Sequence, residues 1–135
     1  MNTSTVKYLG QLRASAIHLQ SNSEVITDAP IDNHGKGEAF SPTDLVATAL
    51  ASCMITVMGI KAEDMGVDLS GTHAIIQKHM SATPRRISEV GVVMNFNQNY
   101  DARIRKILEA TALSCPVSQS LHPDTKQTIT FNYPK

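Results

Sequence analysis

One long apolar stretch decides the fold: SPTDLVATALASCMITVMGI, residues 41–60. It opens with a helix-start signal, because Ser41 is a capping residue, Pro42 suits the first helical position and Asp44 places an acid in the first turn. The residues that follow are apolar almost all round, and Gly66 marks the helix end. The stretch is too short and too rich in small hydroxyl residues to span a bilayer. We therefore expect the central, buried helix of the fold.

Alternating segments flank this helix and predict strands. Before it, residues 5–19 (Leu12 among the strand residues) and 24–27 alternate around a turn at 21–23, which predicts a β-meander, and residues 31–40 form a loop. After it, the predicted elements are strands at 67–80 and 87–96, a helix opening at 97–99, a short third helix from Pro116 to Leu121, and a last strand at 127–133. The order βββ-α-ββ-αα-β predicts an α+β domain.

Chain length and net charge limit the classes of protein to which this sequence can belong. The chain has 135 residues, 41% hydrophobic and without Trp, which fits one domain over residues 1–135. Twelve Lys and Arg balance twelve Asp and Glu, so no overall field favours nucleic acid or an anionic membrane as a partner. The N-terminal residues lack a signal-peptide pattern, which predicts a cytoplasmic protein. Scattered histidines and the lack of a phosphate-binding loop predict neither metal nor cofactor.

The two cysteines, Cys53 and Cys115, lie 62 positions apart. That spacing excludes a CxxC redox motif, a zinc ribbon and a disulfide-stapled secreted scaffold. Two interpretations stay open: two unrelated buried thiols, or a working redox couple. A standing structural disulfide is a third, which the reducing cytosol disfavours.

The local surroundings predict different acidities for the two thiols. Cys53 lies in mid-helix among apolar neighbours, where desolvation is expected to raise a thiol pKa, so it needs a nearby cation to ionise. Cys115 precedes Pro116 and is a plausible N-cap facing free backbone N–H groups. On this evidence Cys115 is the more easily ionised thiol, and which one attacks first is open.

Four segments in order resemble the OsmC/Ohr family (osmotically inducible protein C and organic hydroperoxide resistance proteins), in its OsmC-like branch. They are Leu9-Gly-Gln-Leu-Arg13, Asp28-Ala-Pro30, the stretch from Ser41 to Cys53, and Cys115-Pro-Val-Ser118. The resemblance spans nearly the whole chain, and the two cysteine motifs are specific only together.

The resemblance implies an intertwined homodimer and a thiol peroxidase that acts on organic hydroperoxides in oxidative-stress defence. It implies that Cys53 attacks the peroxide, that Cys115 then forms a disulfide with it, and that a dithiol, either a lipoylated protein or a small thiol, reduces the disulfide. The family's strand arginine maps onto Arg13. A cation is needed there to hold the thiolate and the developing alkoxide.

One position departs from the family pattern. Peroxidase members carry a glutamate directly after the helix-opening proline, where it orients the arginine, whereas this chain has Thr43. Asp44 and the loop residue Glu38 are the candidates to replace it, although Asp44 begins about half a turn away from the Cys53 face. The alternative function is an OsmC-like dimeric binding module for a small hydrophobic ligand, with unreactive buried cysteines.

Overall fold

The chain folds into two compact units, each built on its own small sheet. The computed structural model describes all 135 residues, Met1–Lys135. Contacts within the chain divide it into Met1–Val46 and Ala47–Lys135, and each unit contains a three-stranded sheet. The sequence predicts a single domain over residues 1–135, and the division into two compact units does not test that prediction.

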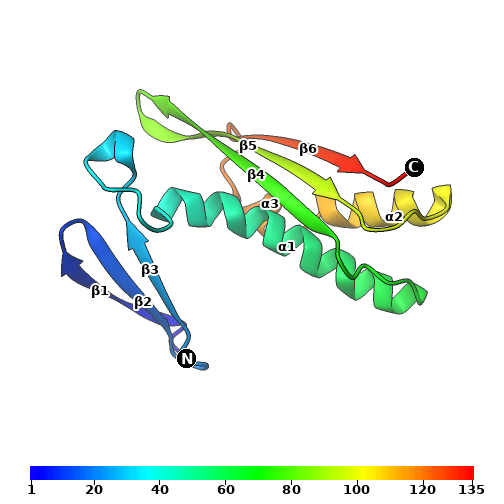
Figure 1. Cartoon of the computed structure of the whole chain (residues 1–135), viewed down its shortest axis with the longest axis horizontal. Coiled ribbons are helices and arrows are strands. Elements are labelled where there is room, and N and C mark those ends of the chain that lie inside the picture. Colours follow the sequence, from blue (N-terminus) through cyan, green and yellow to red (C-terminus); the bar gives the residue numbers. More distant parts are fainter. The chain divides into compact units, whose positions relative to one another are not determined.

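The first unit is the predicted β-meander. Strands β1 (Ser4–Gly10), β2 (Arg13–His18) and β3 (Glu24–Asp28) pair antiparallel in the order β1-β2-β3 (Figure 1). A short 3-10 turn, η1 (Ile31–Asn33), lies in the expected loop. The meander is therefore confirmed.

The β1–β2 turn corrects one expectation. Leu12 was expected in a strand, but it lies with Gln11 in a two-residue turn, and both have positive φ, 55° and 64°. Positive φ at both central residues is typical of the hairpin turn whose twist matches the flanking strands, and it usually selects Asn-Gly. Gln11-Leu12 lacks this sequence signature, so the alternating pattern of apolar and polar residues gave no sign of a turn here.

Helix α1 (Pro42–Met65) runs for 24 residues and ends, as predicted, before Gly66, whose φ is 68°. One of its faces is buried. The buried residues are Ala47, Leu50, Ala51, Met54, Met58 and Ala62.

The opposite side of α1 corrects the expectation of a helix buried all round. Ser52, Thr56 and Ile60 are exposed within the single chain, Ile60 by 60%. The expectation that the helix is too short to span a bilayer is also wrong, because a span needs about 20 residues. By length and composition alone α1 is long enough and apolar enough to cross a membrane, a test that the core helix of a soluble protein also passes.

The second unit places a mixed sheet over helices. Strands β4 (His73–Ala82) and β5 (Arg85–Asn95) pair antiparallel, and β6 (Lys126–Asn132) pairs parallel to β5. The parallel pairing requires a crossover, which α2 (Ala102–Leu113) and α3 (Pro116–Ser120) provide (Figure 1). The two largest differences from the expected boundaries lie at the starts of β4 and α2. Residues 67–72 precede β4 as a loop, and Asp101 rather than residues 97–99 caps α2, its carboxylate accepting the Ile104 N–H.

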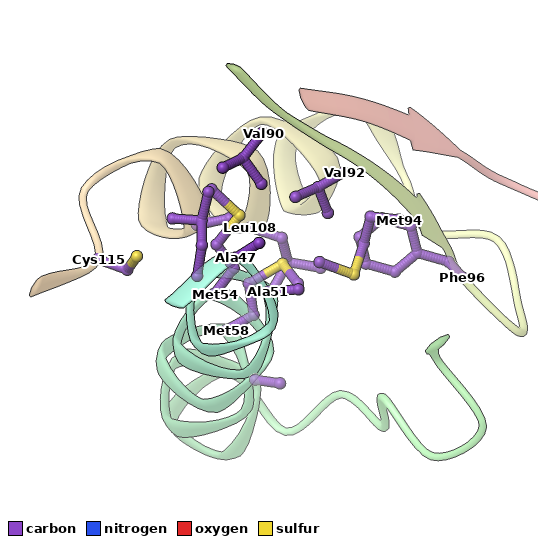
Figure 2. Close-up of a cluster of buried hydrophobic side chains, with 13 residues drawn as sticks. Ala47, Ala51, Met54, Met58, Val90, Val92, Met94, Phe96, Leu108 and Cys115 are labelled. Carbon is purple, nitrogen blue, oxygen red and sulfur yellow. The ribbon is translucent and has the colours of Figure 1, made fainter. Parts of the chain in front are cut away.

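The core of the second unit lies between α1, β5 and α2. Met54 and Met58 from α1 meet Val92 and Leu108 from β5 and α2 (Figure 2). The alternation along β5 turns Val90, Val92, Met94 and the following Phe96 into this cluster, as its sequence predicts. The α+β class and the element order βββ-α-ββ-αα-β are confirmed.

A pair of leucines in α2 tests this assignment of the core. Leu108 is fully buried, whereas Leu113 is 50% exposed. We expect Leu108→Ala to lower the free energy of unfolding by about 2–5 kcal/mol, through lost burial and a cavity, and Leu113→Ala to change it by about 0.5 kcal/mol or less. Chemical denaturation followed by circular dichroism measures both, and equal losses would contradict the assignment.

Candidate functional site

Cys53 lies near the middle of α1, at the edge of the buried face. Its neighbour Met54 is fully buried and Ser52 is exposed, so Cys53 occupies the boundary between core and surface. Its side chain is half-buried and packs against the core cluster. This position gives the thiol rigid support from the helix together with partial access from outside the core.

Cys115 lies in the break between α2 and α3, where the sequence predicts it. The α2 helix ends at Leu113, and Pro116 takes the first position of α3, so Cys115 becomes the N-cap. Its Sγ accepts the backbone N–H of Ser118 at 3.3 Å. Unlike Cys53 it is buried, with 1% of its surface exposed, at one end of the core cluster (Figure 2).

The fold brings the two cysteines together. The Cys53 side chain lies near enough to Cys115 to raise the pKa of its thiol, through hydrogen bonding and through charge. Both cysteines are free thiols in this structure. The 62-residue separation is thus closed by packing α1 beside the α2–α3 break, within one unit of one chain.

Burial works against the acidity that the N-cap position suggests for Cys115. The N-cap exists, and the N–H groups of Ser118 and Val117 do lower its pKa, but burial is the larger effect and the pKa of Cys115 is raised overall. Loss of water around the thiolate, the largest effect, and the neighbouring Cys53 together outweigh the two backbone donors. Cys115 is therefore held as the protonated thiol.

Side-chain hydrogen bonds hold α3, and with it Cys115, to the sheet. Ser118 Oγ donates to Gln127 Oε1 at 2.6 Å, and Gln127 Nε2 donates to the Ser118 carbonyl at 3.1 Å. Thr125, just before β6, donates its hydroxyl to the Ile87 carbonyl of β5 at 3.0 Å. A five-residue helix has little stability of its own, so these bonds fix the cap that carries the thiol.

Arg13 is the first residue of β2 in the other unit. In the strand register it lies directly opposite Asp28, the last residue of β3. Its side chain is half-buried, and its Nε is buried without a hydrogen-bond partner. A buried guanidinium nitrogen without a partner is costly, so this atom calls for an acceptor.

The two candidate orienting carboxylates occupy different settings. The Asp44 carboxylate accepts the Ser41 N–H at 3.0 Å while the Asp44 N–H donates to Ser41 Oγ at 3.0 Å, a capping box that starts α1. Thr43, at the position of the family glutamate, lies with its hydroxyl 3.2 Å from Ser41 Oγ. Glu38 is exposed in its loop. Asp44 thus caps the start of α1. That Asp44 or Glu38 orients Arg13 stays a prediction.

Sequence reasoning missed one charged residue. Asp28 entered the prediction only within the Asp28-Ala-Pro30 segment of the family resemblance and was given no role, yet it is 1% exposed and its Oδ1 has no hydrogen-bond partner. The register of β2 and β3 places Arg13 opposite Asp28, and the alternating pattern of the sequence alone did not define that pairing. Elsewhere, no group of three or more His, Cys, Asp or Glu side chains is arranged to hold a metal ion.

Comparison with known proteins defines the class. The family model described as OsmC-like protein matches residues 35–130, more than half of the chain and both cysteines. The chain therefore belongs to the OsmC-like protein family. No curated protein matches it.

Solved structures agree with this assignment. A Psychrobacter arcticus 273-4 protein, provisionally titled an osmotic stress induced and detoxification response protein, is 60% identical over 98% of this chain and 96% of its own, with a TM-score of 0.95. An organic hydroperoxide resistance protein OsmC from Legionella pneumophila is 18% identical over 98% of both chains, with a TM-score of 0.76. OhrB of Bacillus subtilis is 15% identical over 97% and 98%, with a TM-score of 0.68. The last two show likeness of fold.

The influence of Cys53 on Cys115 can be measured directly. We expect the pKa of Cys115 to be higher in Cys53→Asp than in Cys53→Asn, because a negative charge at position 53 opposes a second one on Cys115. Each variant has a single thiol, so the ultraviolet absorbance of the thiolate, followed against pH, reports Cys115 alone. Equal pKa values in the two variants would contradict the contact.

Proposed function

We propose that this protein is a thiol-dependent peroxidase that reduces organic hydroperoxides in oxidative-stress defence. Membership of the OsmC-like family supports an osmotic-stress or peroxide-detoxification role. The observation that carries the narrower proposal is the contact between two free thiols that lie 62 residues apart in the sequence. A half-exposed thiol beside a buried one is the arrangement that a two-cysteine peroxidase needs.

Cys53 makes the first attack in this proposal. Its thiolate sulfur attacks the terminal oxygen of the hydroperoxide, an S–O bond forms as the O–O bond breaks, and the alkoxide leaves and takes a proton to become the alcohol. Sulfur is oxidised to the sulfenic acid and the peroxide is reduced by two electrons. The assignment to Cys53 follows exposure, because Cys115 is fully buried and is held as the thiol.

Cys115 resolves the sulfenic acid. Its sulfur attacks the Cys53 sulfur, the S–O bond breaks, and water leaves as the disulfide forms. A thiolate at Cys53 raises the pKa of Cys115, whereas a neutral sulfenic acid carries no such charge. The first step therefore removes one obstacle to the second. The Ser118 N–H, 3.3 Å from Sγ, then stabilises the attacking sulfur.

Two further groups complete the cycle. An external dithiol, either a lipoylated protein or a small thiol, reduces the disulfide by thiol–disulfide exchange. Arg13 is the cation that stabilises the Cys53 thiolate and the leaving alkoxide. We place this cycle in the cytoplasm, where dithiol reductants are maintained, and it needs neither metal nor organic cofactor.

Activity is measured as loss of cumene hydroperoxide in the presence of a dithiol. We expect the wild type to consume peroxide continuously and Cys53→Ser to consume none above the uncatalysed rate, because the first nucleophile is gone. In a second assay without dithiol, Cys115→Ser should consume about one equivalent of peroxide and then stop as a sulfenic acid, which a dimedone-type probe traps at Cys53.

The two serine variants also serve as controls for each other. Serine at position 115 keeps an oxygen that can cap α3, so circular dichroism should show both variants folded. A sulfenic acid on Cys115 in the Cys53→Ser variant, formed as one equivalent of peroxide is consumed without dithiol, would reverse the two roles. Wild-type thiols that oxidise no faster than free cysteine would end the peroxidase proposal.

We further propose that the active form is the homodimer that the family resemblance implies. The exposed side of α1 supports it, because Ser52, Thr56 and the apolar Ile60 lie uncovered on a helix whose other face forms the core. A second copy packed there would remove this surface from water.

Light scattering tests the dimer. The wild type should have twice the chain mass, and Ile60→Arg should shift it toward one chain mass, because a charge is placed in the contact. Leu113→Arg, which changes an exposed leucine of α2, is the matched control and should leave the mass unchanged. A monomeric wild type would refute the proposed dimer.

A binding module is the second candidate. A cavity of about 300 Å³ in the first unit has mostly apolar walls, including Tyr8, Leu12 and Pro30. A small hydrophobic ligand would fit such a cavity while both cysteines stayed reduced. A ligand that raises the melting temperature equally in the wild type and in Cys53→Ser, together with no peroxide consumption, would favour this function over the peroxidase.

A further inference from the structure

The meander contains a buried carboxylate that is only half satisfied. Asp28 is 1% exposed, and its Oδ2 accepts the Glu38 N–H at 3.1 Å. Its Oδ1 is buried and has no hydrogen-bond partner. A buried carboxylate lacking both a full set of donors and a cation is strongly unfavourable. The structure therefore calls for a positive partner at Oδ1.

The loop after β3 encloses this carboxylate. The Asp28 N–H donates to the Phe40 carbonyl at 2.9 Å, and the Gly37 N–H donates to the Ala29 carbonyl at 3.3 Å. At Gly35 a side chain would collide with the Ala29 backbone, so only glycine permits this close approach. The Phe40 carbonyl and the Glu38 N–H thus hold Asp28 directly, and the contacts of Gly35 and Gly37 with Ala29 fix the loop that follows it.

The cation that meets this requirement is Arg13. It is the residue directly opposite Asp28 in the β2–β3 register, and opposed residues in antiparallel strands have Cβ atoms about 4.5–5.5 Å apart. Its Nε is also buried and also lacks a partner. Both residues line the 300 Å³ cavity, and its other lining residues are uncharged. One unpaired donor and one unpaired acceptor of opposite charge therefore share one cavity.

We propose that Asp28 is the positioning residue for Arg13, and that it supplies the carboxylate lost with the family glutamate at position 43. The Asp28 carboxylate receives the guanidinium at its free Oδ1 and fixes the direction in which the remaining N–H groups point. The function of that fixed guanidinium rests on the proposed peroxidase activity. The pairing itself does not.

The two carboxylates first considered for this role are less suitable. The Asp44 carboxylate already accepts the Ser41 N–H within the capping box. The Glu38 side chain is exposed, and the part of Glu38 that reaches the site is its backbone N–H, which binds Asp28. Glu38 thus helps to hold Asp28 through its backbone, and Asp28 is the carboxylate that pairs with the Arg13 guanidinium.

The pairing is tested without reference to activity, by nitrogen NMR of the arginine side chains in the full-length protein. In the wild type we expect a resolved Arg13 Nε–H signal that exchanges slowly with water, because a carboxylate holds it. Asp28→Asn keeps an oxygen for the Glu38 N–H but removes the charge, and it should speed exchange of this signal by about tenfold or more. Glu38→Gln removes a neighbouring exposed charge and should leave the signal unchanged.

A double-mutant cycle on unfolding adds a second readout. If the two side chains pair, the effects of Asp28→Asn and Arg13→Gln on the unfolding equilibrium constant should fail to multiply, by a factor of about 2 to 100. Asp28→Glu, which keeps the charge, should restore the slow Nε–H exchange at least in part. Independent effects, or an Arg13 signal indifferent to Asp28→Asn, would overturn the proposal even if Asp28→Asn unfolds more easily.

The role in catalysis is then read from kcat/KM for cumene hydroperoxide. Asp28→Asn should lower kcat/KM by about tenfold to a hundredfold, the range expected for a misplaced catalytic group, but by less than about twofold in an Arg13→Gln background. Intact NMR coupling in a protein without peroxidase activity would leave the pairing standing and refute the proposed function. Loss of activity in Asp28→Asn without any change in the Arg13 signal would refute the pairing and leave the proposed function standing.

Discussion

Packing of one face of α1 against β5 and α2 is the constraint on which the fold of the second unit and its thiol pair both depend. Met54 and Met58 fill the core from the helix, and Leu108 meets them from α2. Because Cys53 precedes Met54, its side chain lies where that face meets the surface, and because α2 ends beside α1, Cys115 reaches it. The same contacts that stabilise the unit therefore assemble the thiol pair.

Burial gives the two thiols different chemical characters. Cys115 has the N-cap environment that often activates a cysteine, but its burial together with the nearby Cys53 outweighs the Ser118 and Val117 donors and raises its pKa. Cys53 keeps partial exposure at the edge of the core. In the proposed peroxidase this difference would order the reaction, since one thiol would meet the peroxide and the other, protonated, would react with the oxidised product.

Local signals in the sequence predicted much of this structure, and tertiary effects account for the rest. The capping box from Ser41 to Asp44 and the break at Pro116 are local, and both appear as expected. The turn at Gln11-Leu12 was missed because its residues are unusual for positive φ. The acidity of Cys115 and the unpaired Oδ1 of Asp28 depend on burial and register, which no local pattern contains.

Cys53 and Cys115 of one chain are expected to form a redox pair. The direct measurement is intact-mass spectrometry and peptide mapping of the reduced protein after one equivalent of cumene hydroperoxide. Each chain should lose the mass of two hydrogen atoms and yield a single peptide pair joined through Cys53 and Cys115. Unchanged thiols, or disulfides that join two chains, would contradict it.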